Sequence, residues 1–233
     1  MTGVLYGVGV GPGAADLMTL RAARLIEGAK VVAYPTLAGG ESFARAIAKD
    51  LIPDGCQEIV MDVPMTVERG PAQAAYDAGA AEIAAALDAG LDVVCLCEGD
   101  PFFYGSFMYL FARLSEAYRV EVVPGVTSVT ACAAQAGLPL AARNERLTIL
   151  PGPLPEDELR HRIEGAESVA IMKVGRHLPK IRGVIEALGL LDQAVYVERV
   201  SLPQEVVTPL AQAPEKAPYF SMILLTKGAD PWL

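Results

Sequence analysis

The stretch Leu5-Tyr6-Gly7-Val8-Gly9-Val10-Gly11-Pro12-Gly13 decides how the beginning of the chain folds. Its apolar residues give way to glycine and proline, which is typical of a buried strand that ends in a tight loop. A helical pattern follows from about Asp16, a residue suited to the N-cap, to Gly28. A strand, a loop and a helix in this order form the repeating unit of α/β proteins.

The same alternation of apolar runs and helical patterns continues through the first half of the chain. Strands are predicted over 30–34, 58–62, 91–97 and 120–123, and helices over 41–50, 71–87, 106–118 and from about 128 to 137. The unbroken apolar character of the run ending at Cys97 is typical of a strand covered on both faces. We therefore expect one mainly parallel sheet here.

The second half contains more strands and fewer helices. Strands are predicted over 147–150, 168–172, 194–200, 205–208 and 219–226, and helices over 156–163 and 178–188. This order predicts a mixed sheet with more antiparallel character. The polar stretch Arg143-Asn144-Glu145-Arg146 lies between two apolar strands. It predicts a boundary between an N-terminal α/β domain, 1–144, and a C-terminal α/β domain, 145–233.

Composition and charge exclude several classes of function. The 233 residues include 19 Lys and Arg against 28 Asp and Glu, a net charge of −9, which repels nucleic acid and anionic lipid. No apolar run is long enough to cross a bilayer, and the start does not read as a signal peptide. Cys95 and Cys97, two residues apart, do not match a zinc-binding spacing, so we expect structural thiols, no metal and a cytoplasmic location.

The glycine-rich start has three interpretations. A dinucleotide fingerprint requires a helix that opens directly on the glycines, but Pro12 removes an N–H there. The second strand also ends in Tyr34-Pro35, where such folds carry an acidic residue. Alternatively, the glycines allow a neighbouring helix to pack closely. In a third interpretation, bare backbone forms the floor of a cavity for a flat ligand.

Three loops in a fixed order carry a resemblance to a known family. They are the start strand with Gly11-Pro12-Gly13, the loop Glu98-Gly99-Asp100-Pro101-Phe102-Phe103-Tyr104-Gly105, and Val123-Pro124-Gly125-Val126-Thr127-Ser128. With Met172-Lys173-Val174-Gly175-Arg176-His177 and Pro218-Tyr219-Phe220-Ser221, the chain resembles the tetrapyrrole (corrin and porphyrin) methyltransferases from Leu5 to Leu225. The resemblance implies two α/β domains that hold S-adenosylmethionine in a cleft, with the tetrapyrrole trough in the first domain.

The resemblance also implies site residues. Cofactor contacts fall on Pro12, Glu98, Gly99, Asp100, Phe103, Tyr104, Thr127, Ser128, Met172, Glu198, Arg199, Ser221 and Met222. Substrate contacts are expected at Gly11, Gly13, Arg143, Lys173, Arg176 and His177, whose cations suit a carboxylate-rich tetrapyrrole. Competing interpretations are helix capping for Thr127 and Ser128, turn formation for Asp100, core packing for Met172 and solvated surface charge for the cations.

The details resemble the branch that methylates C20 of precorrin-2 to give precorrin-3A in cobalamin biosynthesis, with S-adenosylhomocysteine leaving. The sirohaem branch carries two glycines where this chain has Glu98-Gly99, which disfavours uroporphyrinogen. Alternatives are the cobalt form of the substrate, an NAD(P)-linked oxidoreductase and a non-catalytic tetrapyrrole carrier. The base that removes the C20 proton is not identified; Glu98, Tyr104 and His177 are the candidates. A homodimer is expected, with Phe102, Phe107, Tyr109 and Phe111 as candidate interface residues.

Overall fold

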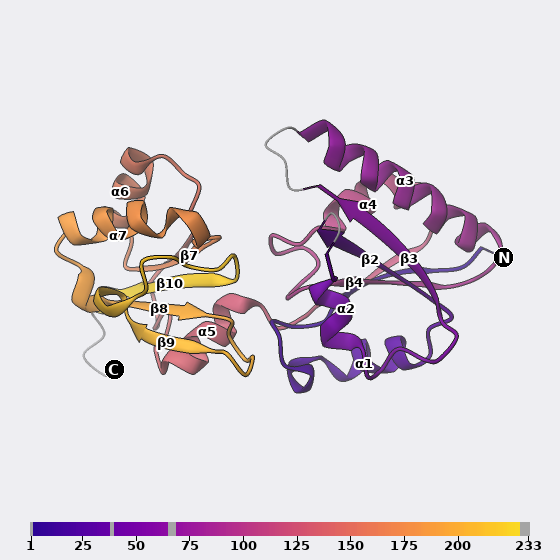
Figure 1. Cartoon of the computed structure of the whole chain (residues 1–233), viewed down its shortest axis with the longest axis horizontal. Coiled ribbons are helices and arrows are strands. Elements are labelled where there is room, and N and C mark those ends of the chain that lie inside the picture. The colour runs from indigo at the N-terminus through magenta and orange to yellow at the C-terminus, as the bar shows by residue number, and fades with distance from the viewer. Residues whose placement is uncertain (1, 38–39, 65–68, 229–233) are drawn as a thin grey trace. The chain divides into compact units, whose positions relative to one another are not determined.

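The computed structural model describes residues 2–37, 40–64 and 69–228, which form two compact units, Met1–Thr127 and Ser128–Leu233 (Figure 1). This division lies earlier in the chain than the boundary after residue 144 that the polar stretch predicts. The reason is that helix α5 (Ser128–Ala136) contacts strands β8 (Ala194–Glu198) and β10 (Ser221–Thr226) of the second unit.

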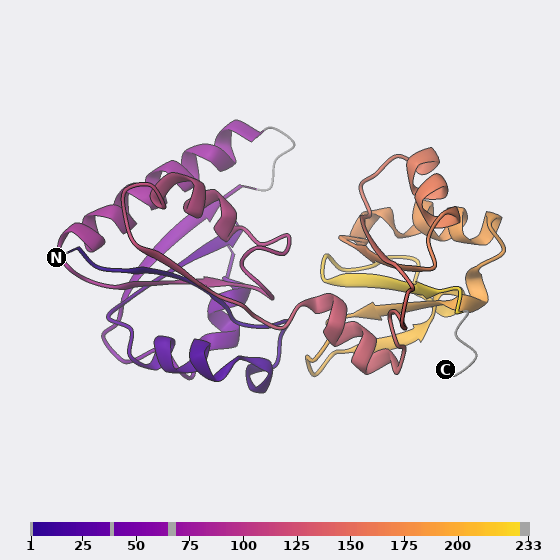
Figure 2. The same ribbon diagram turned by 180° about the vertical axis from the view of Figure 1, so that it is seen from behind.

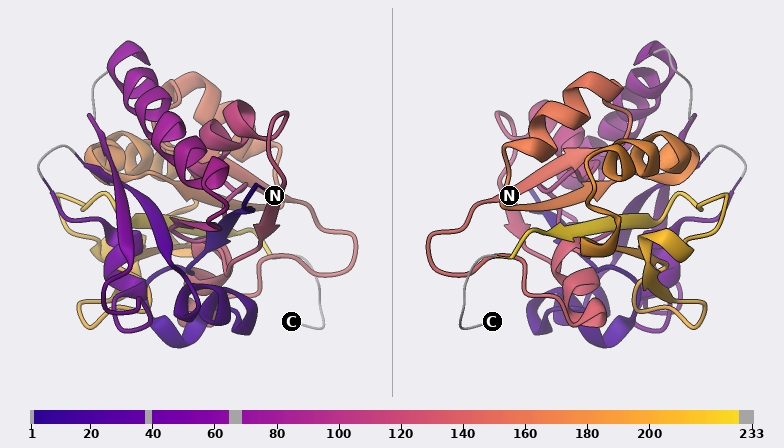
Figure 3. Two further views of the ribbon diagram at one scale, coloured as in Figure 1. Left: turned by 90° about the vertical axis from the view of Figure 1, so that its right-hand side faces the viewer. Right: turned by 90° about the vertical axis from the view of Figure 1, so that its left-hand side faces the viewer.

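The N-terminal unit contains a sheet of five parallel strands in the order β3-β2-β4-β1-β5. The strands are β1 (Leu5–Gly9), β2 (Val31–Leu37), β3 (Gln57–Val63), β4 (Val93–Cys97) and β5 (Val120–Val123). The helices are α1 (Leu20–Glu27), α2 (Phe43–Ala48), α3 (Arg69–Asp88) and α4 (Phe107–Leu114). Helices α3 and α4 cover one face and α1 and α2 the other, as both end views show (Figure 3). The predicted parallel sheet is confirmed.

The central strand β4 is buried on both faces, which explains its apolar run. Cys95 and Cys97 pack into the cluster beneath α3 and α4, whereas Val94 and Leu96 pack into the cluster beneath α1 and α2. Successive side chains of a strand point to opposite faces, so both faces of β4 require apolar residues. The two cysteines are free thiols on the same side of the sheet, as their spacing predicts.

Two local predictions in this unit are wrong. Helix α1 begins after Thr19, whose hydroxyl accepts a hydrogen bond from Ala22 N at 3.2 Å, and not at Asp16, which lies in a separate 3-10 turn, Ala15–Leu17. Strand β2 does not end before Pro35 but runs through it to Leu37. Strand β4 pairs only with residues 31–33 of β2, so a residue without an N–H is tolerated farther along, where β3 alone is the partner.

The C-terminal unit contains a mixed sheet in the order β6-β7-β10-β8-β9 (Figure 2). Its remaining strands are β6 (Leu147–Pro151), β7 (Ser168–Met172) and β9 (Val206–Pro209). Strands β6 and β7 are parallel, and the other neighbouring pairs are antiparallel. Helices α6 (Glu156–Glu164) and α7 (Leu178–Ala187) cover the face opposite α5. The expected mixed sheet is confirmed.

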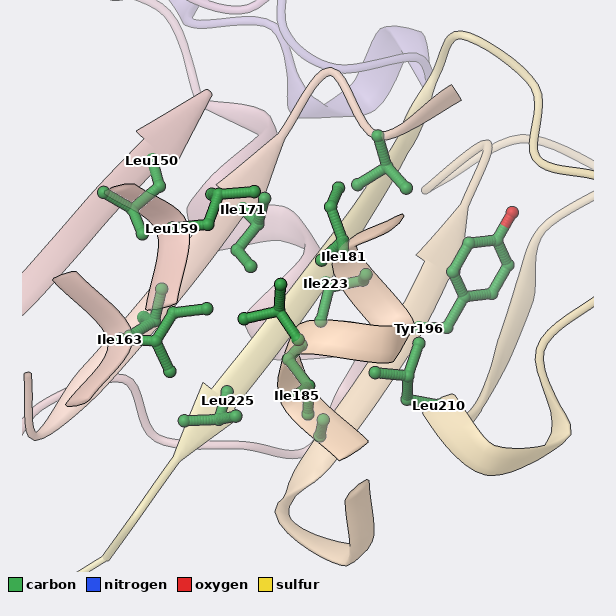
Figure 4. Packing of buried hydrophobic residues seen from close by; sticks show 14 of the residues in the cluster. Leu150, Leu159, Ile163, Ile171, Ile181, Ile185, Tyr196, Leu210, Ile223 and Leu225 are labelled. Carbon is green, nitrogen blue, oxygen red and sulfur yellow. The ribbon is translucent and has the colours of Figure 1, made fainter. Parts of the chain in front are cut away.

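The core of the C-terminal unit lies between its sheet and helices α6 and α7. Ile171 and Ile223 from the sheet pack with Leu159 and Ile181 from the helices, all without exposed surface (Figure 4). Tyr196 borders this cluster beside Leu210, and its hydroxyl points away from the aliphatic side chains. The ring therefore belongs to the core, and the hydroxyl reaches the polar end of strand β8.

None of the helices in the described ranges combines the length and the apolar character that a membrane crossing requires.

Candidate active site

The carboxyl ends of β1, β4 and β5 meet at one edge of the N-terminal sheet because the three strands are neighbours and parallel. We call residues 10–13, 98–105 and 124–127, which follow these strands, the N-terminal loop cluster. Ligands of open parallel sheets bind beyond the carboxyl ends of the strands. Every site residue predicted in this unit, from Gly11 to Thr127, lies in the cluster.

Backbone contact between glycines holds the N-terminal loop cluster together. Gly11 and Gly99 form an antiparallel bridge, with N···O distances of 3.3 Å and 2.7 Å. A Cβ on Gly125 would lie 2.0 Å from Gly99 O and 2.9 Å from Gly9 Cα. Both Gly11 (φ 83°) and Gly99 (φ 62°) adopt left-handed backbone conformations that glycine tolerates best. Gly125 requires glycine because backbone atoms occupy the space of a side chain, whereas Gly11 and Gly99 favour glycine because of their positive φ.

The first glycines of β1 are explained by close packing. A Cβ on Gly7 would lie 2.2 Å from Cε1 of Phe107 in α4, which confirms close helix packing there. Gly9 is also buried, and its Cβ would lie 2.6 Å from Gly99 O. The cavity-floor interpretation is therefore wrong for Gly7 and Gly9. Gly11, Pro12 and Gly13 are buried as well.

Asp100 joins two of the loops. Its Oδ1 accepts a hydrogen bond from Phe102 N at 2.9 Å, and its Oδ2 accepts one from Gly125 N at 3.1 Å. The first bond is the local turn that an aspartate before proline predicts. The second fixes the β5 loop against the β4 loop, so both carboxylate oxygens have backbone partners.

Glu98 is, like Asp100, a half-buried carboxyl group of the N-terminal loop cluster. Burial raises its pKa, and backbone hydrogen bonds from Glu98 itself and from Ala44 act in the opposite direction. Its side chain therefore lies beside the first turn of α2. In the same loop, the rings of Phe103 and Tyr104 meet edge to face at 5.4 Å, and Tyr104 is 43% exposed with φ 56°.

A second group of predicted residues gathers at one edge of the C-terminal sheet. We call residues 172–177, 198–201 and 218–222 the C-terminal loop cluster. Ser221 pairs with Glu198, and Met222 lies beside Val197 in the same ladder. Met172 ends β7, one residue beyond the pair of Ile171 and Ile223. Since β10 is antiparallel to β7 and β8, its amino end meets their carboxyl ends.

A buried polar network occupies this edge. The Tyr196 hydroxyl donates to Glu198 Oε2 at 2.6 Å, and Arg199 Nη1 donates to Glu198 Oε1 at 3.2 Å. Ser221 Oγ accepts from Gly175 N at 3.2 Å and donates to Pro218 O at 2.6 Å. Burial raises the pKa of the Tyr196 hydroxyl, and the bond to Glu198 raises it further. Ser221 therefore joins the loop after β7 to the loop before β10, and the other two bonds lie within the end of β8.

Only some of the predicted cationic residues lie in the C-terminal loop cluster. Lys173 (φ 56°) and Arg199 (φ 48°) directly follow β7 and β8, both with left-handed backbone conformations that cost energy in residues other than glycine. Arg176 is exposed, and the pKa of the half-buried His177 is lowered by burial and then by the charges of Lys180 and Arg176. Arg143, exposed, precedes the amino end of β6, the end opposite Pro151, which pairs with Met172.

Two further predicted residues lie at the point in the sequence where the N-terminal unit ends and the C-terminal unit begins. Thr127 is the last residue of the N-terminal unit, and Ser128 is the first residue of α5. Both lie where the helix begins, as the capping interpretation requires. Among the described residues, no group of three or more His, Cys, Asp and Glu side chains is placed to hold a metal ion.

The profile of the tetrapyrrole (corrin/porphyrin) methylases matches residues 4–214. The chain belongs to this methylase family. It is 43% identical to the precorrin-2 C(20)-methyltransferase of a Sinorhizobium species, over 98% of this chain and 97% of the relative. It is 31% identical to the cobalt-precorrin-2 C(20)-methyltransferase of Salmonella typhimurium, over 97% of this chain and 98% of the relative.

A methylase structure supports the fold assignment. Uroporphyrin-III C-methyltransferase from Thermus thermophilus, complexed with S-adenyl homocysteine, superposes with a TM-score of 0.69 at 26% identity. The match covers 97% of this chain and 92% of that chain. The two-domain methylase fold expected from the three loops is confirmed, and the oxidoreductase and carrier interpretations are not favoured.

Sequence reasoning missed two residues of this methylase. Gly125 lies in one of the three family loops, but its contact with Gly9 and Gly99 depends on which strands are neighbours. Tyr196 lies outside the predicted site residues, although it is two residues before Glu198 on a strand, and residues two apart share a face. That alternation was the available signal.

Proposed function

We propose that this chain transfers a methyl group from S-adenosylmethionine to C20 of precorrin-2, giving precorrin-3A in cobalamin biosynthesis. The observation that carries the proposal is the match along nearly the whole of both chains to a precorrin-2 C(20)-methyltransferase, at 43% identity. The cobalt form of the substrate is the alternative, supported by the more distant relative at 31% identity.

We assign the cofactor to residues of both loop clusters. The backbone of the buried Pro12 and of the half-buried Gly99, with Thr127, provides carbonyl and hydroxyl groups for the ribose and amino acid tail. Met172 and the buried Met222 provide apolar surface for the adenine. Glu98, Phe103, Tyr104 and Ser128 remain assigned to the cofactor site, and Gly11, Gly13, Arg143, Lys173, Arg176 and His177 to the substrate.

Asp100 and Ser221 receive a different role from the one their motifs imply. Each has its side-chain oxygen atoms bonded to one backbone group of its own loop and to one of a neighbouring loop. We assign them the positioning of those loops, which present the binding groups without touching the reacting atoms.

The chemistry requires alignment and exclusion of water. Bound S-adenosylmethionine supplies the electrophilic methyl of a sulfonium, and the electron-rich C20 carbon attacks in line as the carbon–sulfur bond breaks. The protein therefore gains most by holding both partners rigidly, since fixed geometry lowers the barrier. Loops fixed by glycine contacts and by a buried network provide such rigidity. The proton released from C20 passes to a base, for which Glu98, Tyr104 and His177 remain candidates.

The test is an anaerobic incubation with S-adenosylmethionine and either metal-free or cobalt-containing precorrin-2, followed by mass spectrometry and labelled-methyl NMR. A methyl group at C20 of the metal-free substrate is the expected result. Transfer only to the cobalt form would assign the chain to the alternative substrate. The absence of both transfer and S-adenosylhomocysteine binding would overturn the proposal.

We also propose a cytoplasmic homodimer. Phe102, Met108 and Tyr109 expose between 37% and 48% of their surface on the β4 loop and α4. Phe107, expected at the interface, is instead 1% exposed and belongs to the core, and Phe111 is half-buried. Gel filtration with light scattering at micromolar concentration tests the dimer, and a monomer there would overturn it.

A further inference from the structure

Each unit contains a tyrosine, a glutamate and an arginine joined through the carboxylate. In the N-terminal unit, the trio is Tyr34, Arg45 and Glu58. Arg45 Nε donates to Glu58 Oε2 at 2.6 Å and its Nη2 donates to Oε1 at 2.8 Å, while the Tyr34 hydroxyl also donates to Oε2. The guanidinium is thus paired with both carboxylate oxygens, in the bidentate geometry that arginine and carboxylate prefer.

The C-terminal trio consists of Tyr196, Glu198 and Arg199. Its arginine is not paired with both carboxylate oxygens. Tyr196 has no exposed surface and Glu198 is 8% exposed. Arg199 reaches the carboxylate through Nη1 alone, at 3.2 Å, and 43% of its side chain is exposed. Within the described part of the chain, this is the only hydrogen bond of the guanidinium. Its Nε and Nη2 donors therefore remain available for a second planar acceptor.

The backbone around Arg199 is held in place at some energetic cost. Arg199 has φ 48°, a left-handed conformation, and its N–H donates to Phe220 O at 2.9 Å. Strained backbone persists only where the surroundings enforce it, and such residues cluster at binding sites. The buried network beneath Arg199 provides that enforcement and directs the guanidinium from the end of β8.

We propose that Arg199 binds a carboxylate of the tetrapyrrole substrate, and that Tyr196 positions Arg199 by holding Glu198. This inference rests on the proposed function and reassigns Arg199 from cofactor to substrate. A planar guanidinium fork matches a carboxylate. The chain carries a net charge of −9, so a substrate rich in carboxylates requires local cations. Lys173 and Arg176 belong to the same loop cluster, which therefore offers more cations than the single carboxylate of the cofactor requires.

The test measures steady-state kinetics with precorrin-2 and calorimetric binding of S-adenosylhomocysteine. For Arg199→Ala we expect KM for precorrin-2 to rise roughly tenfold, the value of one charge-assisted bond. We expect kcat and the Kd for S-adenosylhomocysteine to stay within about twofold. Arg199→Lys, which keeps the charge but loses the fork, should fall between the wild type and Arg199→Ala.

Tyr196→Phe tests the positioning step. It keeps the ring and removes only the hydroxyl, so KM for precorrin-2 should rise by about threefold. In the double variant with Arg199→Ala, the change at Tyr196 should add nothing further to KM, because both substitutions act on one interaction. A merely structural role would add its full effect in both backgrounds.

Two matched controls accompany these variants. Tyr34→Phe removes the equivalent hydroxyl from the closed trio, and Arg162→Ala removes an exposed cation that pairs with Glu158 on α6. Both should leave KM for precorrin-2 unchanged.

The outcomes separate the inference from the proposed function. A wild-type protein that neither binds S-adenosylhomocysteine nor methylates precorrin-2 fails the proposed function. If the wild type does both, a loss in Arg199→Ala confined to S-adenosylhomocysteine affinity would assign Arg199 to the cofactor's carboxylate and overturn the inference. An unchanged KM in that variant would overturn it as well.

Discussion

The two loop clusters are held together in different ways. In the N-terminal cluster, backbone lies directly against backbone: a Cβ on Gly9 or on Gly125 would lie 2.6 Å or 2.0 Å from Gly99 O. In the C-terminal cluster, the Ser221 hydroxyl connects two of the loops, and Tyr196 and Glu198 form a buried pair at the end of β8. A substitution that adds a single methyl group disrupts a direct backbone contact, whereas a substitution within a hydrogen-bond network removes only some of its bonds. The first cluster should therefore tolerate substitution less well than the second.

The largest effect is expected from Gly125→Ala. Its Cβ would lie 2.0 Å from Gly99 O and 2.9 Å from Gly9 Cα, and both neighbours are backbone atoms that cannot rotate away. We expect a loss of at least about 3 kcal/mol of unfolding free energy, or failure to fold. Urea unfolding followed by circular dichroism measures it.

Gly183→Ala in α7 is the matched control for this substitution. Nothing lies within 4 Å of its added Cβ, so alanine should stabilise the helix by about 0.5–1 kcal/mol. Equal effects of the two substitutions would refute the importance of backbone contact.

A smaller effect is expected from Asp100→Ala, which removes side-chain bonds within the backbone-held cluster. Phe102 N and Gly125 N would both lose their acceptor, at a cost of about 2 kcal/mol for the pair. Asp100→Asn keeps one carbonyl oxygen and should cost about half as much. Hydrogen exchange at the Phe102 and Gly125 amides should rise in Asp100→Ala; unchanged protection would show that water or another group replaces the carboxylate.

A still smaller effect is expected from Ser221→Ala in the network-held cluster. Gly175 N loses its acceptor, but Tyr196 and Glu198 keep their bond, so the cost should be about 1 kcal/mol. The same urea unfolding experiment applies. A cost equal to that of Gly125→Ala would remove the distinction between the two clusters.

Strand order explains what the sequence could and could not predict about these clusters. The alternation of apolar runs and helical patterns predicted both sheets, because α/β units repeat regularly. The unbroken apolar run of β4 predicted a strand buried on both faces. Close helix packing was one of three interpretations of the glycines of β1, and sequence alone does not decide among them, because the neighbours of Gly7 and Gly9 come from α4 and from the loops after β4 and β5. Such contacts depend on tertiary structure and leave no local pattern.

Local errors had local causes. Asp16 and Thr19 are both good N-cap residues, and sequence alone does not tell which of two adjacent candidates begins the helix. Pro35 lies within β2 because only one neighbouring strand pairs there. The predicted site residues fall into two groups at strand ends, but their partners were not predictable: the bonds of Asp100 and Ser221 show that a motif residue can hold loops in place.

The closed trio of the N-terminal unit gives the smallest expected effect and tests whether side-chain pairs matter there. The hydrogen bond from Arg45 lowers the pKa of Glu58 to about 2, which is below the value of about 4.3 for an unfolded chain. Between these values the unfolded state binds more protons, so the contribution of the trio is fully present above pH of about 4.3 and is lost as pH falls toward 2.

Both side chains are partly exposed, so Glu58→Gln should cost less than about 1 kcal/mol at pH 7. Thermal unfolding from pH 7 to pH 2.5 should show the wild type and Glu58→Gln converging in acid, and Arg45→Met should remove the same pH dependence. A difference between wild type and Glu58→Gln that is as large at pH 2.5 as at pH 7 would show that the loss arises from packing around Tyr34 instead of from the charge of Glu58.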